Sequence, residues 1–342
     1  MKVFYSSFLD DNASILPKSN IIWKQLEKNV NFCYNMGIMN DMERYRHLNE
    51  YYKEKFGERT LKICVDGGFT CPNRDGTKGY GGCIYCSEKG SGELINKVQG
   101  ITEQIKYYFT TYRAERANKF IVYFQNFTNT YDTIENLKAK YDAALIDDRI
   151  IGISIGTRPD CINEEIAKLL KTYTKKYYVC VELGLQTAND KIGEIINRRY
   201  TSNDFTKAVE ILNKYDIDVI THIMVGLPGE THQDVMDTVD FINKHKVQGV
   251  KIHSTYVVKN TKLAQMYKNG EYKALDIDDY IETLIDIMTH LRPDIIIHRI
   301  SGDSPKDILV APNWNKHKMW ILHGFEKRFR ARDLWQGKFY ES

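Results

Sequence analysis

Three cysteines in one short stretch are the residues of this sequence best placed to do chemistry. Cys71, Cys83 and Cys86 follow the spacing C-x11-C-x2-C, in a glycine-rich stretch directly after the apolar run 61–65. A loop of this kind has few side chains to pack and much backbone freedom, so it can wrap a compact metal centre with its thiolates turned inward. Three ligands leave a fourth position on the metal for another group to fill.

The cysteine spacing is compatible with more than one metal. A structural zinc site normally has four protein ligands, and Cys64 could complete an all-thiolate set. Cys64, however, lies inside the apolar run, where a cysteine behaves as a small hydrophobic residue. An iron-sulfur cluster with one exposed iron therefore fits this loop better than zinc, and a loop without any metal is a third alternative.

The elements that must position this loop follow from the hydrophobic pattern. Near-continuous apolar runs alternate with amphipathic stretches, several of which open with a capping residue such as Asp132, Asn163 or Thr231. This alternation predicts a parallel sheet covered by helices, hence an α/β fold built as a partial (β/α)6 TIM-like barrel with a C-terminal α/β extension. Chemistry in such barrels gathers at the C-terminal ends of the strands. We expect strands at residues 61–65, 120–124, 150–155, 178–183, 219–225 and 249–252.

Composition and charge restrict the classes of function. The chain has 342 residues, with 48 Lys and Arg against 45 Asp and Glu, and seven cysteines. Net charge alone indicates no polyanionic partner, so any nucleic-acid surface must be local. No apolar run approaches the ~20 residues of a membrane span, and the N-terminus has no signal-peptide pattern. We expect a cytoplasmic protein without a membrane partner, whose cysteines are thiols or metal ligands rather than disulfides.

The predicted barrel has a segment on each side. Residues 1–42 are polar without a repeated apolar period, and we expect a poorly ordered N-terminal extension. Residues 43–255 form the predicted barrel, with the cysteine loop at 66–92. Residues 256–342 form the C-terminal extension, which contains a helical apolar stripe from Ile277 to Leu291 and a further apolar strand at 295–297.

The end of the chain is basic and aromatic. Residues 313–338 interleave tryptophan and phenylalanine with the basic residues Lys316, Lys318, Lys327, Arg328, Arg330 and Arg332. These side chains could contact phosphates while the aromatic rings stack on bases, which predicts a salt-dependent RNA-binding face. The alternative is an amphipathic helix that covers the barrel and exposes a solvated basic face.

The sequence around the cysteines resembles a known family. Residues 66–77 together with 82–86 are similar to the cluster loop of radical S-adenosylmethionine (SAM) proteins. The resemblance is closest to the YhcC-like subfamily, which is related to the catalytic subunit of the Elongator complex. It continues through residues 123–131, 156–160, 181–187 and 226–231, and ends with the run 335–338, so it covers about residues 43–340.

The resemblance implies cofactors and a reaction type. Cys71, Cys83 and Cys86 would hold a [4Fe-4S] cluster whose unique iron is chelated by SAM, which explains three cysteines rather than four. A small redox protein would reduce the cluster, and SAM would be cleaved to methionine and a 5′-deoxyadenosyl radical. The protein then has to orient the substrate and exclude water.

The resemblance also implies that SAM is bound at the ends of the strands. An arginine such as Arg158 suits bidentate recognition of a carboxylate. Glu182 follows an apolar run and is better explained by a cavity than by a core, where an unpaired glutamate would be costly. Alternatives for the other positions are a loop cap or an ordinary turn. The candidate SAM contacts are Gln125, Asn126, Thr157, Arg158, Asp160, Glu182, Gln186, Val225, Gly226 and Glu230.

Three histidines in or beside the predicted strands are less informative. His222, His253 and His298 could face the barrel interior as proton donors. A structural histidine with satisfied hydrogen bonds is the more frequent case, and we expect that role for each.

The expected substrate is transfer RNA, because Elongator-type relatives act on its wobble uridine, and the C5 side chain of that base is the candidate group. The chain ends before any acetyl-group-handling domain, so we do not expect the complete reaction of that relative. Two alternatives remain: a zinc-stabilised RNA-binding module, and an iron-sulfur protein that only transfers electrons. Neither alternative needs the polar strand ends described above.

Overall fold

The fold is described here from a computed structural model, which covers residues 44–90, 92, 95, 100–302 and 304–341. Tyr45–Ser342 forms one compact unit. The predicted N-terminal extension at 1–42 therefore lies outside the described residues. Among the helices that are described, none has the length and apolar character needed to cross a membrane.

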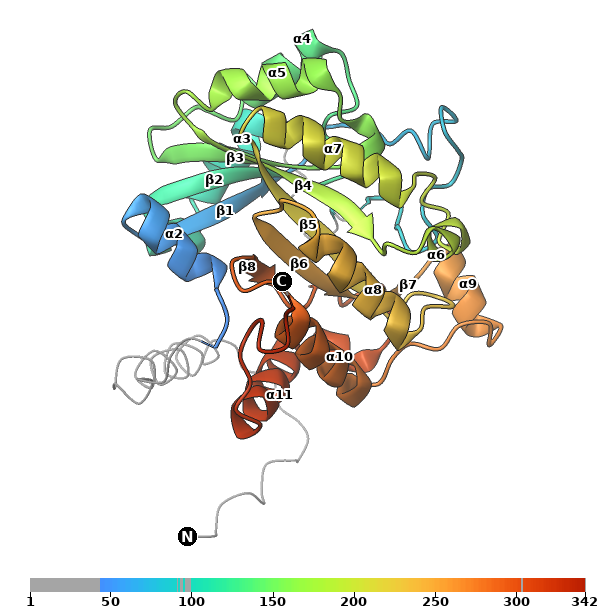
Figure 1. Ribbon diagram of the computed structural model, residues 1–342. Helices are drawn as coiled ribbons and strands as arrows, with labels where there is room; N and C mark the ends of the chain where they lie inside the picture. Colours follow the sequence, from blue (N-terminus) through green and yellow to red (C-terminus); the bar gives the residue numbers. More distant parts are fainter. Residues whose placement is uncertain (1–43, 91, 93–94, 96–99, 303, 342) are drawn as a thin grey trace, which may run out of the picture. The chain divides into compact units, whose positions relative to one another are not determined.

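A parallel sheet forms the centre of the fold (Figure 1), with strand order β1-β2-β3-β4-β5-β6-β8. All six strands expected from the sequence are present, which confirms the α/β partial-barrel prediction. A seventh strand, β8, pairs in parallel with β6 and comes from the apolar run that the sequence analysis placed in the C-terminal extension. The strands are β1 (Thr60–Val65), β2 (Lys119–Phe124), β3 (Ile150–Thr157), β4 (Tyr178–Gln186), β5 (Asp218–Val225), β6 (Gly249–Ser254) and β8 (Ile296–Arg299).

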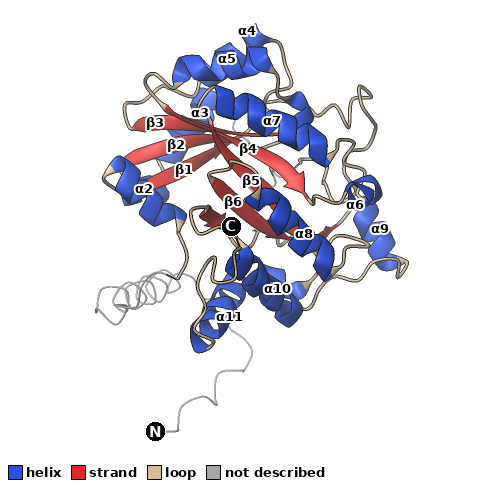
Figure 2. Cartoon of the chain, in the orientation of Figure 1, coloured by secondary structure: helices blue, strands red, loops and turns tan. Residues whose placement is uncertain are grey.

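Helices follow the strands and lie outside the curved sheet (Figure 2). The predicted caps at Asn163 and Thr231 are confirmed, since both side chains accept a hydrogen bond from the first turn of their helix. The predicted cap at Asp132 is wrong by one residue, because Thr133 caps that helix. The helices are α2 (Leu48–Phe56), α3 (Ile101–Phe109), α4 (Ile134–Asp142), α5 (Glu164–Tyr173), α6 (Asp190–Ile195), α7 (Ser202–Lys214), α8 (His232–Asn243), α9 (Lys262–Lys268), α10 (Ile277–His290) and α11 (Lys318–Ala331).

Short elements complete the fold. The two-residue strand β7 (Val257–Val258) pairs with β9 (Leu309–Ala311) in an antiparallel ribbon. Single turns of 3-10 helix occur at η1 (Tyr112–Arg116), η2 (Pro159–Cys161) and η3 (Asn313–Lys316). Helix α2 contacts both β1 and β8, so it lies across the gap between the first and last strands of the sheet.

The two faces of the sheet differ in chemistry because successive side chains on a strand point to opposite faces. The neighbouring residues Ile63, Val122 and Ile153 belong to the apolar core beneath the helices. The next row, which includes Cys64 and Ser154, faces the inside of the curved sheet. This inner face also carries charged residues, so the interior is a polar cavity rather than a second core.

Candidate active site

The cysteine loop begins directly after β1 and folds back on itself through backbone hydrogen bonds. Arg74 N donates to Cys71 O (2.8 Å), Gly82 N to Asn73 O (2.8 Å) and Cys86 N to Cys83 O (3.0 Å). Gly81 and Gly82 have φ values of 78° and 77°, a left-handed conformation that favours glycine. These turns bring three thiols that are up to fifteen positions apart onto one side of the loop.

All three loop cysteines line one cavity of about 600 Å³ inside the curved sheet. The cavity is also lined by residues from the carboxyl ends of the strands, including Gln125, Thr157, Arg158 and Gln186. Loops at the C-terminal ends of parallel strands necessarily meet at one edge of the sheet. The structure therefore brings the predicted metal ligands together with part of the predicted SAM site.

The donor set of the loop fits a multinuclear cluster. Among the residues that the structure describes, no group of three or more His, Cys, Asp or Glu side chains is arranged around a single metal ion. A cluster is larger than one ion, so its thiolates need not converge on a point. Burial, together with the neighbouring Cys83, raises the pKa of the Cys86 thiol to about 12, and burial also raises the pKa of Cys83. Metal binding at this loop would thus release protons.

Asn73 connects the loop to a neighbouring segment. Its buried side chain donates to Asn197 O (2.6 Å) and its amide nitrogen lies 3.8 Å from Cys83 Sγ. Asn197 in turn donates to Gly82 O (2.8 Å), and Ile84 N donates to Ile196 O (3.1 Å). The segment after α6 thus fixes the position of the loop from outside it.

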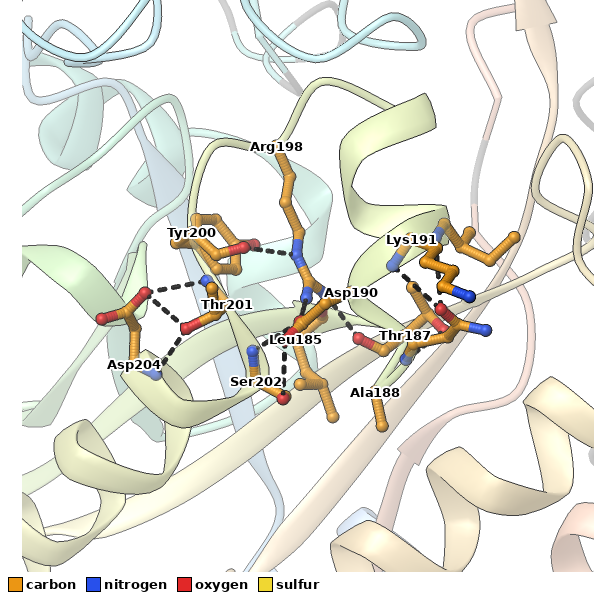
Figure 3. Close-up of polar contacts among 12 residues, drawn as sticks. Leu185, Thr187, Ala188, Asp190, Lys191, Arg198, Tyr200, Thr201, Ser202 and Asp204 are labelled. Atoms are coloured by element: carbon orange, nitrogen blue, oxygen red, sulfur yellow. Dashed lines mark hydrogen bonds and ion pairs between the residues drawn. The ribbon is translucent and has the colours of Figure 1, made fainter.

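Arg198 anchors this neighbouring segment to β4 (Figure 3). Its fully buried guanidinium donates to the carbonyls of Leu185, Thr187 and Tyr200 and pairs with Asp190 (2.6 Å). One buried side chain therefore donates to three backbone carbonyls and also pairs with a half-exposed carboxylate. The sequence analysis did not single out Arg198.

Five of the ten candidate SAM contacts line the cavity, namely Gln125, Thr157, Arg158, Glu182 and Gln186. The other five do not. Asn126 donates to Asp66 (2.7 Å) beside the start of the cysteine loop, and Asp160 pairs with Lys78 (2.6 Å) and Arg158. Val225 and Gly226 use their carbonyls to accept from Thr255 N (2.9 Å) and the Tyr272 hydroxyl (2.8 Å). The fifth, Glu230, accepts from the backbone at the start of its own turn. Their roles as SAM contacts stay predictions.

Arg158 has defined protein partners. Nε and Nη2 donate to the two carboxylate oxygens of Asp160, each at 2.9 Å, and Nη1 donates to Arg198 O (2.9 Å). Burial alone would lower the pKa of the guanidinium, but Asp160 raises it. Arg158 is thus a fixed positive charge at the cavity wall whose bidentate carboxylate partner in this structure is Asp160.

Glu182 lies at the cavity, as the sequence analysis expected, and its carboxylate is paired. Its oxygens accept from Lys62 Nζ (2.6 Å), Ser154 Oγ (2.6 Å), His222 Nε2 (2.7 Å) and Lys251 Nζ. Burial on its own would raise the pKa of this carboxyl, but Lys251 and Lys62 lower it well below its usual range. The carboxylate stays charged, and it lines the same cavity as the cysteines.

Glu230 closes the Gly-Leu-Pro-Gly turn after β5. Its carboxyl accepts from Gly226 N (2.7 Å) and Leu227 N (3.1 Å). Burial raises the pKa of this group to about 8, although the two backbone donors act in the opposite direction. The folded protein therefore favours the protonated side chain up to a pH at which an unfolded glutamate is already ionised.

We expect Glu230→Gln to remove a pH dependence of stability. With a folded pKa of about 8 against an unfolded value of 4.5, Glu230 contributes most below pH 4.5, and this contribution falls as the pH rises to 8. The change is at most about 1.4 kcal/mol per pH unit in this window. Urea unfolding of both proteins at pH 5 and pH 8 measures it. Relative to the wild type, Glu230→Gln should be more stable at pH 8 than at pH 5. An equal difference in unfolding free energy at the two pH values would contradict the raised pKa of Glu230.

The predicted RNA-binding residues lie on η3, on α11 and just beyond it. Helix α11 packs on α10 and buries Ile321, Phe325 and Phe329, as expected for an amphipathic helix. Arg328 and Arg332 pair with Glu282 on α10, and Arg328 also with Asp278. None of the six basic residues belongs to the described lining of the cavity, and their contact with RNA stays a prediction.

Several cavity residues were missed or assigned another role by the sequence analysis. Lys62, Lys251 and Arg299 line the cavity together with His222, His253 and His298. His222 is hydrogen-bonded as a structural histidine would be, but the buried atoms His253 Nε2 and His298 Nδ1 have no hydrogen-bond partner among the described residues. A sequence signal for Lys62 and Lys251 did exist. Each lysine lies in an apolar strand, two positions from another polar residue, and this alternation places both on one face of the strand.

Comparison with protein families finds two matches in this chain. Residues 71–242 match the model described as the radical SAM superfamily, and residues 247–331 match the radical SAM C-terminal domain. The first match begins at Cys71 and includes the ends of β2, β3 and β4 that line the cavity.

Known proteins resemble the chain over different lengths. YtqA of Bacillus subtilis is 37% identical over 304 residues, 88% of this chain and 94% of its own, and YhcC of Escherichia coli is 32% identical over 77% of this chain and 85% of its own. A tRNA uridine(34) acetyltransferase of Methanocaldococcus jannaschii is 31% identical over 47% of this chain, but the match spans only 30% of that enzyme.

A solved structure shares the fold. An N-terminally truncated Elp3 of Methanocaldococcus infernus superposes with a TM-score of 0.59 over 81% of this chain and 64% of that one, at 19% sequence identity. At this identity the likeness concerns the fold alone, which agrees with the seven-stranded half-barrel described above.

Proposed function

Because this chain belongs to the radical SAM superfamily, we propose that it is an enzyme that cleaves SAM reductively at a [4Fe-4S] cluster held by Cys71, Cys83 and Cys86. The observation that carries the proposal is the position of these thiols on one cavity with the polar strand ends. When bound, the cluster would supply the one electron needed to cleave SAM into methionine and a 5′-deoxyadenosyl radical. A small redox protein is the proposed electron donor.

The chain's own residues would bind and orient the cofactor and exclude water. Gln125, Thr157 and Gln186 project from the ends of β2, β3 and β4 at the cavity wall. They offer hydroxyl and amide groups suited to the polar parts of SAM. Arg158 adds a fixed positive charge beside them. Enclosure of the reactants inside the curved sheet would limit the access of bulk solvent, which favours controlled radical chemistry.

We propose transfer RNA as the substrate class, with a wobble-uridine C5 side chain as the candidate group. The support is the similarity to the tRNA uridine(34) acetyltransferase, which extends over 170 residues, 47% of this chain. That similarity spans less than a third of the relative, so acetyl transfer is not part of the proposal.

Anaerobic reconstitution tests the proposal. The protein is incubated with iron and sulfide, reduced in the presence of SAM, and analysed by chromatography for 5′-deoxyadenosine. Product formation supports a radical SAM enzyme, and its acceleration by one tRNA would identify the substrate. A reconstituted cluster that is reduced without SAM cleavage would instead support an electron-transfer protein, and a colourless protein that retains zinc would refute the cluster.

The basic tail gives a separate prediction about RNA binding. We expect Lys327→Gln to reduce the slope of log affinity against log salt by roughly 0.7–0.9, the value for one phosphate contact. Lys327 is exposed on α11, whereas Arg332 is engaged by both oxygens of Glu282 (2.6 and 2.9 Å). Arg332→Gln is therefore the matched control and should change the slope less. Filter binding of tRNA between low and moderate salt measures both. An unchanged slope in Lys327→Gln would make the tail purely structural.

A further inference from the structure

A buried asparagine lies against one of the three loop thiols. Asn73 is fully buried, and its side-chain nitrogen lies 3.8 Å from Cys83 Sγ, within hydrogen-bond distance of a sulfur acceptor. A thiol sulfur is a weak acceptor, but the thiolate that binds a metal is negatively charged. Hydrogen bonds to the sulfurs are among the features that set the reduction potential of an iron-sulfur cluster. Asn73 is therefore placed to affect a cluster directly, besides its contribution to the fold of the loop.

The orientation of the Asn73 amide follows from its other partner. The same nitrogen lies 2.6 Å from Asn197 O, and a carbonyl oxygen can only accept a hydrogen bond. The reverse orientation would place the amide oxygen of Asn73 against this carbonyl, and two acceptors repel each other. The amide nitrogen has two hydrogens, so one is donated to Asn197 and the second can be donated to Cys83 Sγ.

A closed ring of hydrogen bonds holds Asn73 in this position. Asn73 donates to Asn197 O, Asn197 Nδ2 donates to Gly82 O (2.8 Å), and Gly82 N donates back to Asn73 O (2.8 Å). Asn197 has a φ of 56°, a left-handed conformation in which asparagine is several-fold enriched. Gly82 directly precedes Cys83, so the ring fixes the donor side chain relative to the backbone of the acceptor residue.

The position of the donor determines the sign of its effect. Arg74 Nη2 donates to Cys86 O (3.2 Å) and so acts on the backbone of a ligand residue, whereas the Asn73 amide reaches the sulfur that would bind iron. Reduction adds a negative charge to a cluster, and its sulfur ligands carry part of that charge. A hydrogen bond to such a sulfur is stronger in the reduced state, so it stabilises that state and raises the reduction potential.

We propose that Asn73 raises the reduction potential of the cluster through a hydrogen bond to the Cys83 thiolate. This inference rests on the proposed function, because it requires a cluster held by the loop cysteines. A raised potential allows a weaker electron donor to reduce the cluster, but it also limits the reducing power that the cluster then has. Asn73 thus sets the balance between these two requirements.

A redox titration followed by electron paramagnetic resonance measures this effect in the reconstituted protein, without SAM or RNA. Asn73→Leu keeps a side chain of similar size but removes both amide hydrogens. Loss of one charge-assisted hydrogen bond should make reduction about ten-fold less favourable, which for a one-electron couple lowers the midpoint potential by about 59 mV. Asn73→Asp replaces the donor with a negative charge, so its potential should be lower still. Iron and sulfide analysis shows first which variants hold the cluster.

Asn197→Gly is the matched control for a disturbed loop. Glycine adopts the positive φ at this position without strain and keeps the backbone carbonyl that accepts from Asn73, while the hydrogen bond to Gly82 O is lost. The loop of this variant should be less stable, but the potential of its cluster should equal that of the wild type.

The possible outcomes separate this inference from the proposed function. An unchanged potential in an Asn73 variant that holds the cluster would overturn the inference. Loss of the cluster from both variants would overturn it as well, because Asn73 would then only build the loop. An equal shift in Asn197→Gly would attribute the effect to a loosened loop. A wild-type protein without a cluster would refute the proposed function, whereas the expected shifts without SAM cleavage would refute that function but retain the role of Asn73.

Discussion

Cys83→Ala should lose bound iron and sulfide and reduce 5′-deoxyadenosine formation by more than about 100-fold. The expected loss exceeds the 10–100-fold typical of second-shell partners of a metal, because Cys83 would be a ligand itself. Cys83 Sγ also lies 3.8 Å from the side-chain nitrogen of Asn73, and Cys83 lies between Cys71 and Cys86 in the chain. Iron and sulfide analysis after anaerobic reconstitution, followed by the SAM-cleavage assay, measures both effects.

Cys64→Ala is the control that distinguishes the two metals. Cys64 lies on β1 with its side chain exposed to the cavity, and it was the candidate fourth ligand of a zinc site. Iron and sulfide content should match the wild type if three cysteines hold a cluster. Loss of metal in both variants would instead indicate a four-thiolate site and contradict the proposed cofactor.

Arg198→Ala should lower the free energy of unfolding by about 2–5 kcal/mol, because it removes a large, fully buried side chain and leaves buried carbonyls without their donor. The substitution leaves a cavity and removes the donor to the carbonyls of Leu185, Thr187 and Tyr200. Because the neighbouring Ile196 and Asn197 hold the cysteine loop, iron incorporation should fall as well. Urea unfolding followed by circular dichroism gives the stability change.

Two variants control for the arginine itself. Arg116→Ala removes an exposed arginine and should change stability by no more than about 0.5 kcal/mol. Arg198→Lys retains the charge but cannot reach all four acceptors with one ammonium group, so its stability should lie between those of the wild type and Arg198→Ala. Equal stability of Arg198→Ala and Arg116→Ala would show that the buried network contributes nothing.

Local sequence patterns determined the fold class, the position of the cysteine loop and the edge of the sheet where the site lies. Apolar runs such as 120–124 became strands because their side chains can be buried on a parallel sheet, and the loop after the first run had to emerge at its carboxyl end. The caps at Asn163 and Thr231 were predictable because a cap depends on neighbours three residues away. Whether Asp132 or Thr133 caps α4 was not predictable, since both residue types can cap a helix.

Tertiary structure decided which distant residues meet. The sequence placed Glu182 at a cavity but did not reveal its partners, because Lys62 and Lys251 lie 120 and 69 positions away. The period of two predicts which residues of a strand share a face, but not which residues of neighbouring strands lie opposite one another. That depends on strand order and stagger. Tertiary structure also decided the place of β8, because its apolar run could join the sheet only once α10 had returned the chain beside β6. It decided the role of Arg198 as well, because the acceptors of that side chain come together only in the folded chain.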